Sequence, residues 1–60
     1  MSREAIAEIQ KLLIRLSFAP GRSDGTISPE TGEAISLFQQ FAGASVDGLP
    51  SAELLAELRQ

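Results

Sequence analysis

Apolar residues recur at spacings of three and four along the first part of the chain, and charged residues fill the positions between them. The apolar positions are Ala5, Ile6, Ile9, Leu12, Leu13 and Leu16. This spacing places them on one face of an amphipathic helix. Ser2 is expected to cap the start of this helix. The helix is expected to stop near Ser17 or Phe18, because the segment 19–21, Ala-Pro-Gly, cannot continue it.

Two further helix starts follow, each marked by a serine. Ser28 can cap the unpaired amides of a first turn, and Pro29 suits the first helical position because its missing N–H costs nothing there. This second helix is expected to run to Gly43, with apolar positions Ala34, Ile35, Leu37, Phe38 and Phe41. A third helix is expected to begin at Ser51 and to run through Leu54, Leu55 and Leu58 to the end of the chain. The pattern predicts an all-α fold, a compact three-helix bundle.

The turns before the second and third helices repeat one pattern at an offset of 23 residues. Segment 24–30 aligns with segment 47–53, and both have Asp, Gly, Ser and Glu at the same places. Phe18 and Phe41 also match, each six residues before its Asp. Asp-Gly is typical of a tight turn in which glycine accepts positive φ, and the following Ser and Glu begin a helix. This structural interpretation explains most of the internal pseudo-repeat. The functional alternative is that the two loops meet on one side of the bundle and frame a groove.

The helical spacing also predicts which side chains form the core. All three phenylalanines, Phe41 included, are interpreted as core residues. Besides Phe41, the expected core positions are Ile6, Ile9, Leu13, Leu16, Phe18, Ile27, Ala34, Ile35, Phe38, Val46, Leu54, Leu55 and Leu58.

Length and composition exclude several classes of site and function. Sixty residues make one domain, 1–60, which we expect to be excised from or appended to a larger protein. Cys and His are both absent, so disulfides and nearly every zinc site are excluded, and no metal or cofactor is expected. The longest unbroken apolar run, 12–14, is far shorter than the roughly 20 residues that span a bilayer, so no membrane insertion is expected. A net charge of -3, with five cations that form no run, argues against nucleic acid.

Catalytic chemistry finds no support, and an enzyme is not expected. The chain has no Cys to act as a nucleophile and no His to activate a serine. Its one lysine, Lys11, lies on the solvated face of its helix. The calcium-loop template fails at both Asp-Gly turns, because its closing Glu position would fall on Thr31 or Leu54. Paired carboxylates need a deep cleft to hydrolyse glycosides, and a chain of this length hardly builds one. The eight acidic residues are interpreted as helix caps, turns and solvated faces.

Several segments, in this order and spacing, resemble the type 1 peptidoglycan-binding domain family. They are Ile9–Leu13, Leu16–Phe18, Pro20-Gly21, Asp24–Thr31, Ala34–Gln39 and Val46–Gly48, which together extend over nearly the whole chain. The resemblance implies a compact bundle of three helices with a pseudo-repeat, in agreement with the repeat described above. It also implies a non-catalytic module of the kind attached to cell-wall hydrolases, transpeptidases and other envelope proteins.

The first functional hypothesis therefore follows from this resemblance. It is a peptidoglycan-binding module that anchors a larger protein in the bacterial cell envelope or periplasm, as a monomer when isolated. The expected ligand is peptidoglycan or muropeptide, in a shallow polar groove formed by Gln39 of the second helix with the loop residues Arg22, Ser23, Asp24, Gly25 and Thr26. For any single one of these residues, a purely structural role is the stronger expectation.

A second hypothesis comes from a different class. It is a protein-interaction or localisation module that keeps the bundle without wall binding, so that another protein is its partner. The absence of Trp and Tyr and the acidic charge balance favour this alternative, because sugar rings are usually held on exposed aromatic faces. The two Asp-Gly turns and the dipeptide Phe38-Gln39 favour the first hypothesis.

Overall fold

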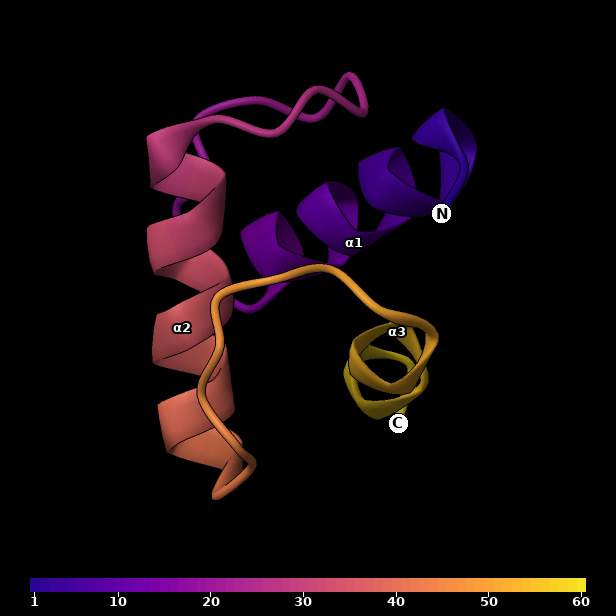
Figure 1. The fold of residues 1–60 in the computed structure, drawn as a ribbon. Coiled ribbons are helices and arrows are strands. Elements are labelled where there is room, and N and C mark those ends of the chain that lie inside the picture. The colour runs from indigo at the N-terminus through magenta and orange to yellow at the C-terminus, as the bar shows by residue number, and fades with distance from the viewer.

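The computed structural model describes residues 1–60, which form three α-helices and no strand, as the sequence pattern predicts. Helix α1 spans Arg3–Arg15, α2 spans Pro29–Ala42 and α3 spans Ala52–Leu58. In Figure 1, α2 stands along one side of the molecule, α1 approaches it from the amino terminus, and α3 lies under α1. Helix α1 contacts both of the others. The whole measures 26 × 20 × 19 Å, which confirms a compact all-α domain.

The three serines predicted as caps all occupy that position. Each hydroxyl accepts a hydrogen bond from the backbone N–H three residues ahead, at 3.1 Å for Ser2, 3.3 Å for Ser28 and 3.0 Å for Ser51. All three residues have extended backbone, as an N-cap requires. Pro29 opens α2, as predicted. The beginnings of the helices are therefore encoded locally.

Helices α1 and α2 end in the same way, with a residue in the left-handed region. After α1 this residue is Ser17, with φ of 69°, and after α2 it is Gly43, with φ of 73°. The backbone N–H groups of Ser17 and Phe18 bond to carbonyls of the last turn of α1, both at 2.9 Å. This is the arrangement of a Schellman motif, which satisfies the unpaired carbonyls of a helix end. Glycine suits the left-handed position, whereas a serine there is strained.

The core lies where the three helices meet. Its buried apolar side chains come from every helix and were all expected: Ile9, Leu13, Ala34, Ile35, Phe38, Leu54, Leu55 and Leu58. Ile6 and Phe18, also expected there, are half-buried. The ring of Phe18 meets that of Phe38 edge to face, with centroids 5.9 Å apart. This geometry is the preferred one for aromatic pairs.

Four expected core residues are not in the core. Leu16, Ile27 and Val46 are each about half exposed, and Phe41 is 82% exposed. Leu16 caps the end of α1, and Ile27 and Val46 lie in connecting segments that no second layer covers. Helix α2 extends beyond the part that α1 covers, as Figure 1 shows, and Phe41 lies in its last turn. A domain this small has too little chain to bury every apolar position that its helices offer.

Candidate functional site

Both Asp-Gly turns close on the carboxylate of their own aspartate. Oδ1 of Asp24 accepts a hydrogen bond from the N–H of Thr26 at 2.9 Å, and Oδ1 of Asp47 accepts one from the N–H of Leu49 at 2.9 Å. A short polar side chain that bonds to the backbone two residues ahead forms an Asx-turn. The repeat seen in the sequence is therefore also a repeat of turn geometry.

A buried glutamine holds each turn from the side of the core. Oε1 of Gln10, on α1, accepts a hydrogen bond from the N–H of Gly25 at 2.8 Å. Oε1 of Gln39, on α2, accepts one from the N–H of Gly48 at 3.0 Å. Both amides thus bind the glycine N–H that a tight turn leaves unpaired.

The two glycines are required by their backbone and by their surroundings. Gly25 has φ of 86° and Gly48 has φ of 67°, values that other residues rarely adopt. A Cβ on Gly25 would lie 2.5 Å from the carbonyl oxygen of Arg3. A Cβ on Gly48 would lie 2.7 Å from Oγ of Ser36 and 3.3 Å from the carbonyl oxygen of Gly32. The first turn therefore packs against the start of α1, and the second against the middle of α2.

Gln10 is the centre of a polar network that joins α1, the first turn and α2. Its Nε2 donates to the carbonyl of Thr26 at 2.8 Å and to Oγ1 of Thr31 at 3.1 Å. The hydroxyl of Thr31 in turn donates to the carbonyl of Pro20 at 2.9 Å. Gln10 and Thr31 are both fully buried, and no buried side-chain polar atom of the structure lacks a partner. A fully satisfied network of this kind specifies one arrangement of the elements it joins.

Sequence reasoning missed Gln10. The signal was its position, because Gln10 follows Ile9 and precedes Leu13 on the face of α1 that packs into the core. A polar side chain at such a position must find partners inside the protein. The sequence alone did not say that those partners are the backbone groups of an Asp-Gly turn.

The predicted site residues do not all come together. One continuous turn contains five of them: Arg22, Ser23, Asp24, Gly25 and Thr26. Gln39 lies on α2 and makes its hydrogen bonds to the second turn, not to this one. Gln39 is 5% exposed, and its Nε2 donates to Oδ1 of Asp47 at 2.9 Å in the second turn. It lies ten residues along α2 from Pro29, which is about 15 Å at the rise of an α-helix.

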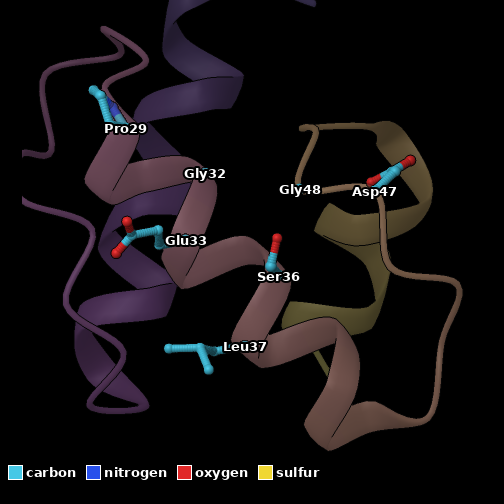
Figure 2. Close-up of a pocket in the computed structure, with 7 residues that line it drawn as sticks. All are labelled: Pro29, Gly32, Glu33, Ser36, Leu37, Asp47 and Gly48. Atoms are coloured by element: carbon cyan, nitrogen blue, oxygen red, sulfur yellow. The ribbon is translucent and has the colours of Figure 1, made fainter.

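Residues 22–26 line no hollow together with the second turn, although Pro29, near the end of the first repeat segment, lies on the hollow beside the second turn. The larger hollow, about 540 Å³ and open to solvent, lies between α2 and the second turn (Figure 2). Its lining residues are Pro29, Gly32, Glu33, Ser36, Leu37, Asp47 and Gly48. Figure 2 shows the hydroxyl of Ser36 directed toward Gly48, while the carboxylate of Glu33 points away from the turn. This lining has two carboxylates and no cation.

A smaller hollow of about 260 Å³ lies beside the first turn. It is lined by Gly21, Arg22, Ser28 and Glu30. Nε of Arg22 lies 3.6 Å from Oδ2 of Asp24, an ion pair in which both side chains are about half exposed. Such exposed pairs are weak and are readily exchanged for another partner. Of the residues predicted for the site, Arg22 is the one that lines a hollow beside the first turn.

The hydrogen bonds of the turns set the charge of their aspartates. The N–H of Thr26 holds the pKa of Asp24 below its ordinary value, and the nearby Arg22 guanidinium lowers this pKa further. The pKa of Asp47 is also lowered, mainly by the amide of Gln39 and then by the N–H of Leu49. Both carboxylates are therefore ionised at neutral pH and serve as acceptors within their own turns.

A third carboxyl group with a lowered pKa, that of Glu8, lies away from both turns. The two guanidinium nitrogens of Arg59 donate to the carboxylate of Glu8 at 2.9 Å each, and these bonds lower the pKa of Glu8 and raise that of Arg59. The pair fastens the end of α3 to α1. Elsewhere, the acidic side chains form no group of three that could hold a metal ion. None of the helices is long and apolar enough to cross a membrane.

The family model described as "Putative peptidoglycan binding domain" matches residues 2–58. The chain belongs to this family. The match begins at the cap of α1 and ends at the last residue of α3, so the peptidoglycan-binding fold includes all three helices and both turns. This family is one of binding domains and is associated with the bacterial cell wall. No curated protein and no solved structure matches the chain.

Proposed function

We propose that this chain is a non-catalytic module that binds peptidoglycan and holds a larger envelope protein on the wall, on the periplasmic side where the wall lies. The observation that supports this most strongly is the family match over residues 2–58. In this proposal residues 1–60 are one unit, appended to or cut from the protein that it anchors, and monomeric when isolated. The fold suits such a task, because its polar network fixes the turns without occupying the outward surface.

The wall contact is proposed for the outward side of the first turn. Arg22 supplies a guanidinium that can bind the carboxylates of stem peptides, and Ser23 and Thr26 add polar groups in the same turn. The hydroxyl of Thr26 also accepts a hydrogen bond from Arg3 at 3.4 Å. Asp24 and Gly25 shape this turn through the hydrogen bonds described above and are not expected to bind the ligand directly. Gln39 has the same supporting role in the second turn.

Sedimentation with purified sacculi tests this proposal. The folded domain is expected to pellet with sacculi in a saturable way and to be displaced by soluble muropeptides. A helical protein of similar size and net charge serves as the control. Pelleting no greater than that of the control would contradict wall binding. Release of sugar or peptide from the sacculi would contradict the non-catalytic assignment.

Arg22→Ala tests the proposed location, with Arg15→Ala as a control that removes the same charge from an exposed position on α1. Arg22→Ala is expected to change stability by no more than about 0.5 kcal/mol, because the side chain has no core contact. It is expected to weaken sacculus binding and to reduce its dependence on salt. Equal binding by Arg22→Ala and Arg15→Ala at low salt would remove Arg22 from the site.

One observation favours the alternative of a protein-interaction or localisation module. Phe41 is 82% exposed and Leu37, one turn earlier on α2, is 54% exposed. The ring of Phe41 lies against that of Phe18, with centroids 6.2 Å apart. Exposed apolar side chains that lie together are a feature of protein-interaction surfaces. A folded domain that fails to pellet with sacculi, and whose association with a partner protein is lost in Phe41→Gln, would favour this alternative.

A further inference from the structure

The hollow beside the first turn has a cation and an anion that do not pair with each other. Arg22 and Glu30 both line it. The ion pairs of the structure join Arg22 to Asp24 and Arg59 to Glu8, so Glu30 has no cationic partner. The guanidinium of Arg22 makes no hydrogen bond to the protein, and its contact with Asp24, at 3.6 Å, is longer than a hydrogen bond. Two residues of opposite charge therefore line the same hollow, and Glu30 is not paired with a cation of the protein.

The backbone keeps both groups at this hollow. The connecting segment leaves α1, passes the start of α2 and returns to it at Ser28 (Figure 1). Gly21, which has φ of 86°, lies so close to α2 that a Cβ there would be 3.0 Å from Cβ of Glu30. The hydroxyl of Thr31 donates a hydrogen bond of 2.9 Å to the carbonyl of Pro20, the residue before Gly21. The base of Glu30 and the backbone next to Arg22 are thus fixed with respect to each other.

We propose that this hollow recognises an amino-acid zwitterion at the end of a stem-peptide side chain, with Arg22 binding its carboxylate and Glu30 its ammonium. A guanidinium binds a carboxylate through two parallel hydrogen bonds, and a carboxylate is a suitable acceptor for an ammonium. This inference rests on the proposed function. It adds the class of wall: stem peptides with diaminopimelate, whose side chain ends in both an ammonium and a carboxylate, are preferred over those with lysine, whose side chain ends in an ammonium alone.

Size and charge both favour this hollow over the larger one. A volume of about 260 Å³ is below the range of pockets that enclose a drug-sized ligand, and it suits an end group instead of a disaccharide. None of its four lining residues is apolar, which agrees with a doubly charged ligand group. The larger hollow has only the carboxylates of Glu33 and Asp47, which would repel the carboxylate of a zwitterion.

Two soluble muramyl tripeptides test the proposal, one ending in diaminopimelate and the other in lysine and otherwise the same. Their dissociation constants are measured by titration against the folded domain. Wild type is expected to bind the diaminopimelate probe about fivefold more tightly, the size of one exposed ion pair. Arg22→Ala is expected to lower affinity for this probe to that for the lysine probe. Glu30→Gln is expected to lower the affinity for both probes by the same factor, because both have the ammonium.

Matched variants make each outcome decisive. Arg15→Ala and Glu53→Gln remove the same charges at exposed positions outside the hollow and are expected to leave both affinities unchanged. Thermal melts of all variants show whether each is folded. Equal affinity of wild type for the two probes, or a preference that persists in Arg22→Ala, would overturn the zwitterion site and leave wall binding standing. Binding of neither probe, together with no pelleting on sacculi, would overturn the proposed function itself.

Discussion

Gln10 and Gly25, fifteen residues apart, are joined by a hydrogen bond of 2.8 Å from the backbone N–H of the glycine to Oε1 of the glutamine. Gly25 is buried and Gln10 is fully buried. The same side chain donates to the carbonyl of Thr26, so one amide satisfies two backbone groups of the turn. The first turn is therefore part of the folded core, although its outer residues face solvent.

Gln10→Ala is expected to destabilise the domain strongly. The N–H of Gly25 and the carbonyl of Thr26 would lose their partner, and leaving one buried polar group unpaired costs about 1 to 3 kcal/mol. Chemical denaturation followed by circular dichroism measures this loss. A change below about 0.5 kcal/mol, the range of an ordinary surface substitution, would contradict the structural role of Gln10.

Gln10→Glu provides the matched comparison. A carboxylate can still accept from Gly25, but it cannot donate to Thr26 or Thr31, and burial raises the pKa of a carboxyl group. The protonated carboxyl regains one donor. The free energy of unfolding of this variant is therefore expected to approach that of wild type as the pH is lowered. Chemical denaturation of both proteins at each pH measures this difference. A difference that does not change with pH would contradict the donor role of Nε2.

Ser17→Gly is expected to stabilise the domain. Ser17 has φ of 69°, a left-handed conformation that costs a residue with a Cβ about 1 to 2 kcal/mol. Glycine avoids this cost but loses more chain entropy on folding, so a net gain of about 0.5 to 1 kcal/mol is expected. The thermal midpoint measures the gain. A lower midpoint for Ser17→Gly than for wild type would show that the hydroxyl has a role of its own.

Much of the fold could be predicted from the sequence because its signals are local. A serine cap depends on residues within one helical turn, and the caps Ser2, Ser28 and Ser51 were all predicted correctly. Burial depends instead on what covers a residue from elsewhere in the chain. Phe41 has the apolar character and spacing of a core residue, yet no other helix covers the last turn of α2. Periodicity indicates the face of a helix and not how far along that face its neighbours extend.

Phe38→Ala and Phe41→Ala separate these two environments by the same chemical change. Phe38 is buried, and truncating a buried aromatic costs about 3 to 5 kcal/mol, close to the whole stability of a domain of this size. Phe38→Ala is therefore expected to be largely unfolded by circular dichroism at 25 °C. Phe41→Ala is expected to change stability by about 0.5 kcal/mol or less. Equal loss in the two variants would contradict the exposed position of Phe41.

Acid is expected to destabilise the domain through its bonded carboxylates. The pKa values of Asp24, Asp47 and Glu8 are lowered by hydrogen bonds that exist only in the folded state. Their ionised forms therefore stabilise the fold fully above the ordinary carboxyl pKa of about 4, and this contribution is lost as the pH falls through the lower folded values. Denaturation between pH 5 and pH 2 is expected to show the decline. Asp47→Asn, which keeps the acceptor oxygen but cannot be protonated, is expected to lose less stability over this pH range than wild type. An equal loss would contradict a contribution of the Asp47 carboxylate to acid sensitivity.

The candidate site could be predicted only in part. The residues Arg22 to Thr26 are neighbours in the chain, so the sequence was enough to place them together. Gln39 and the first turn are distant in the chain, and the repeat gave no information on which turn this amide would bind. The internal repeat also aligned Phe18 with Phe41, but Phe18 follows α1 and is half-buried, whereas Phe41 lies within α2 and is exposed. A fixed offset in sequence does not account for connecting segments of different length.

Chemical-shift mapping with a soluble muropeptide tests wall binding through the first turn most directly. Backbone amide shifts of the labelled domain are followed while the diaminopimelate tripeptide is added. We expect saturable shifts at Gly21, Arg22 and Glu30, and unchanged shifts at Leu37 and Gly48 beside the larger hollow. Saturable shifts confined to the larger hollow would contradict this location, and the absence of any saturable shift would contradict peptidoglycan binding by this domain.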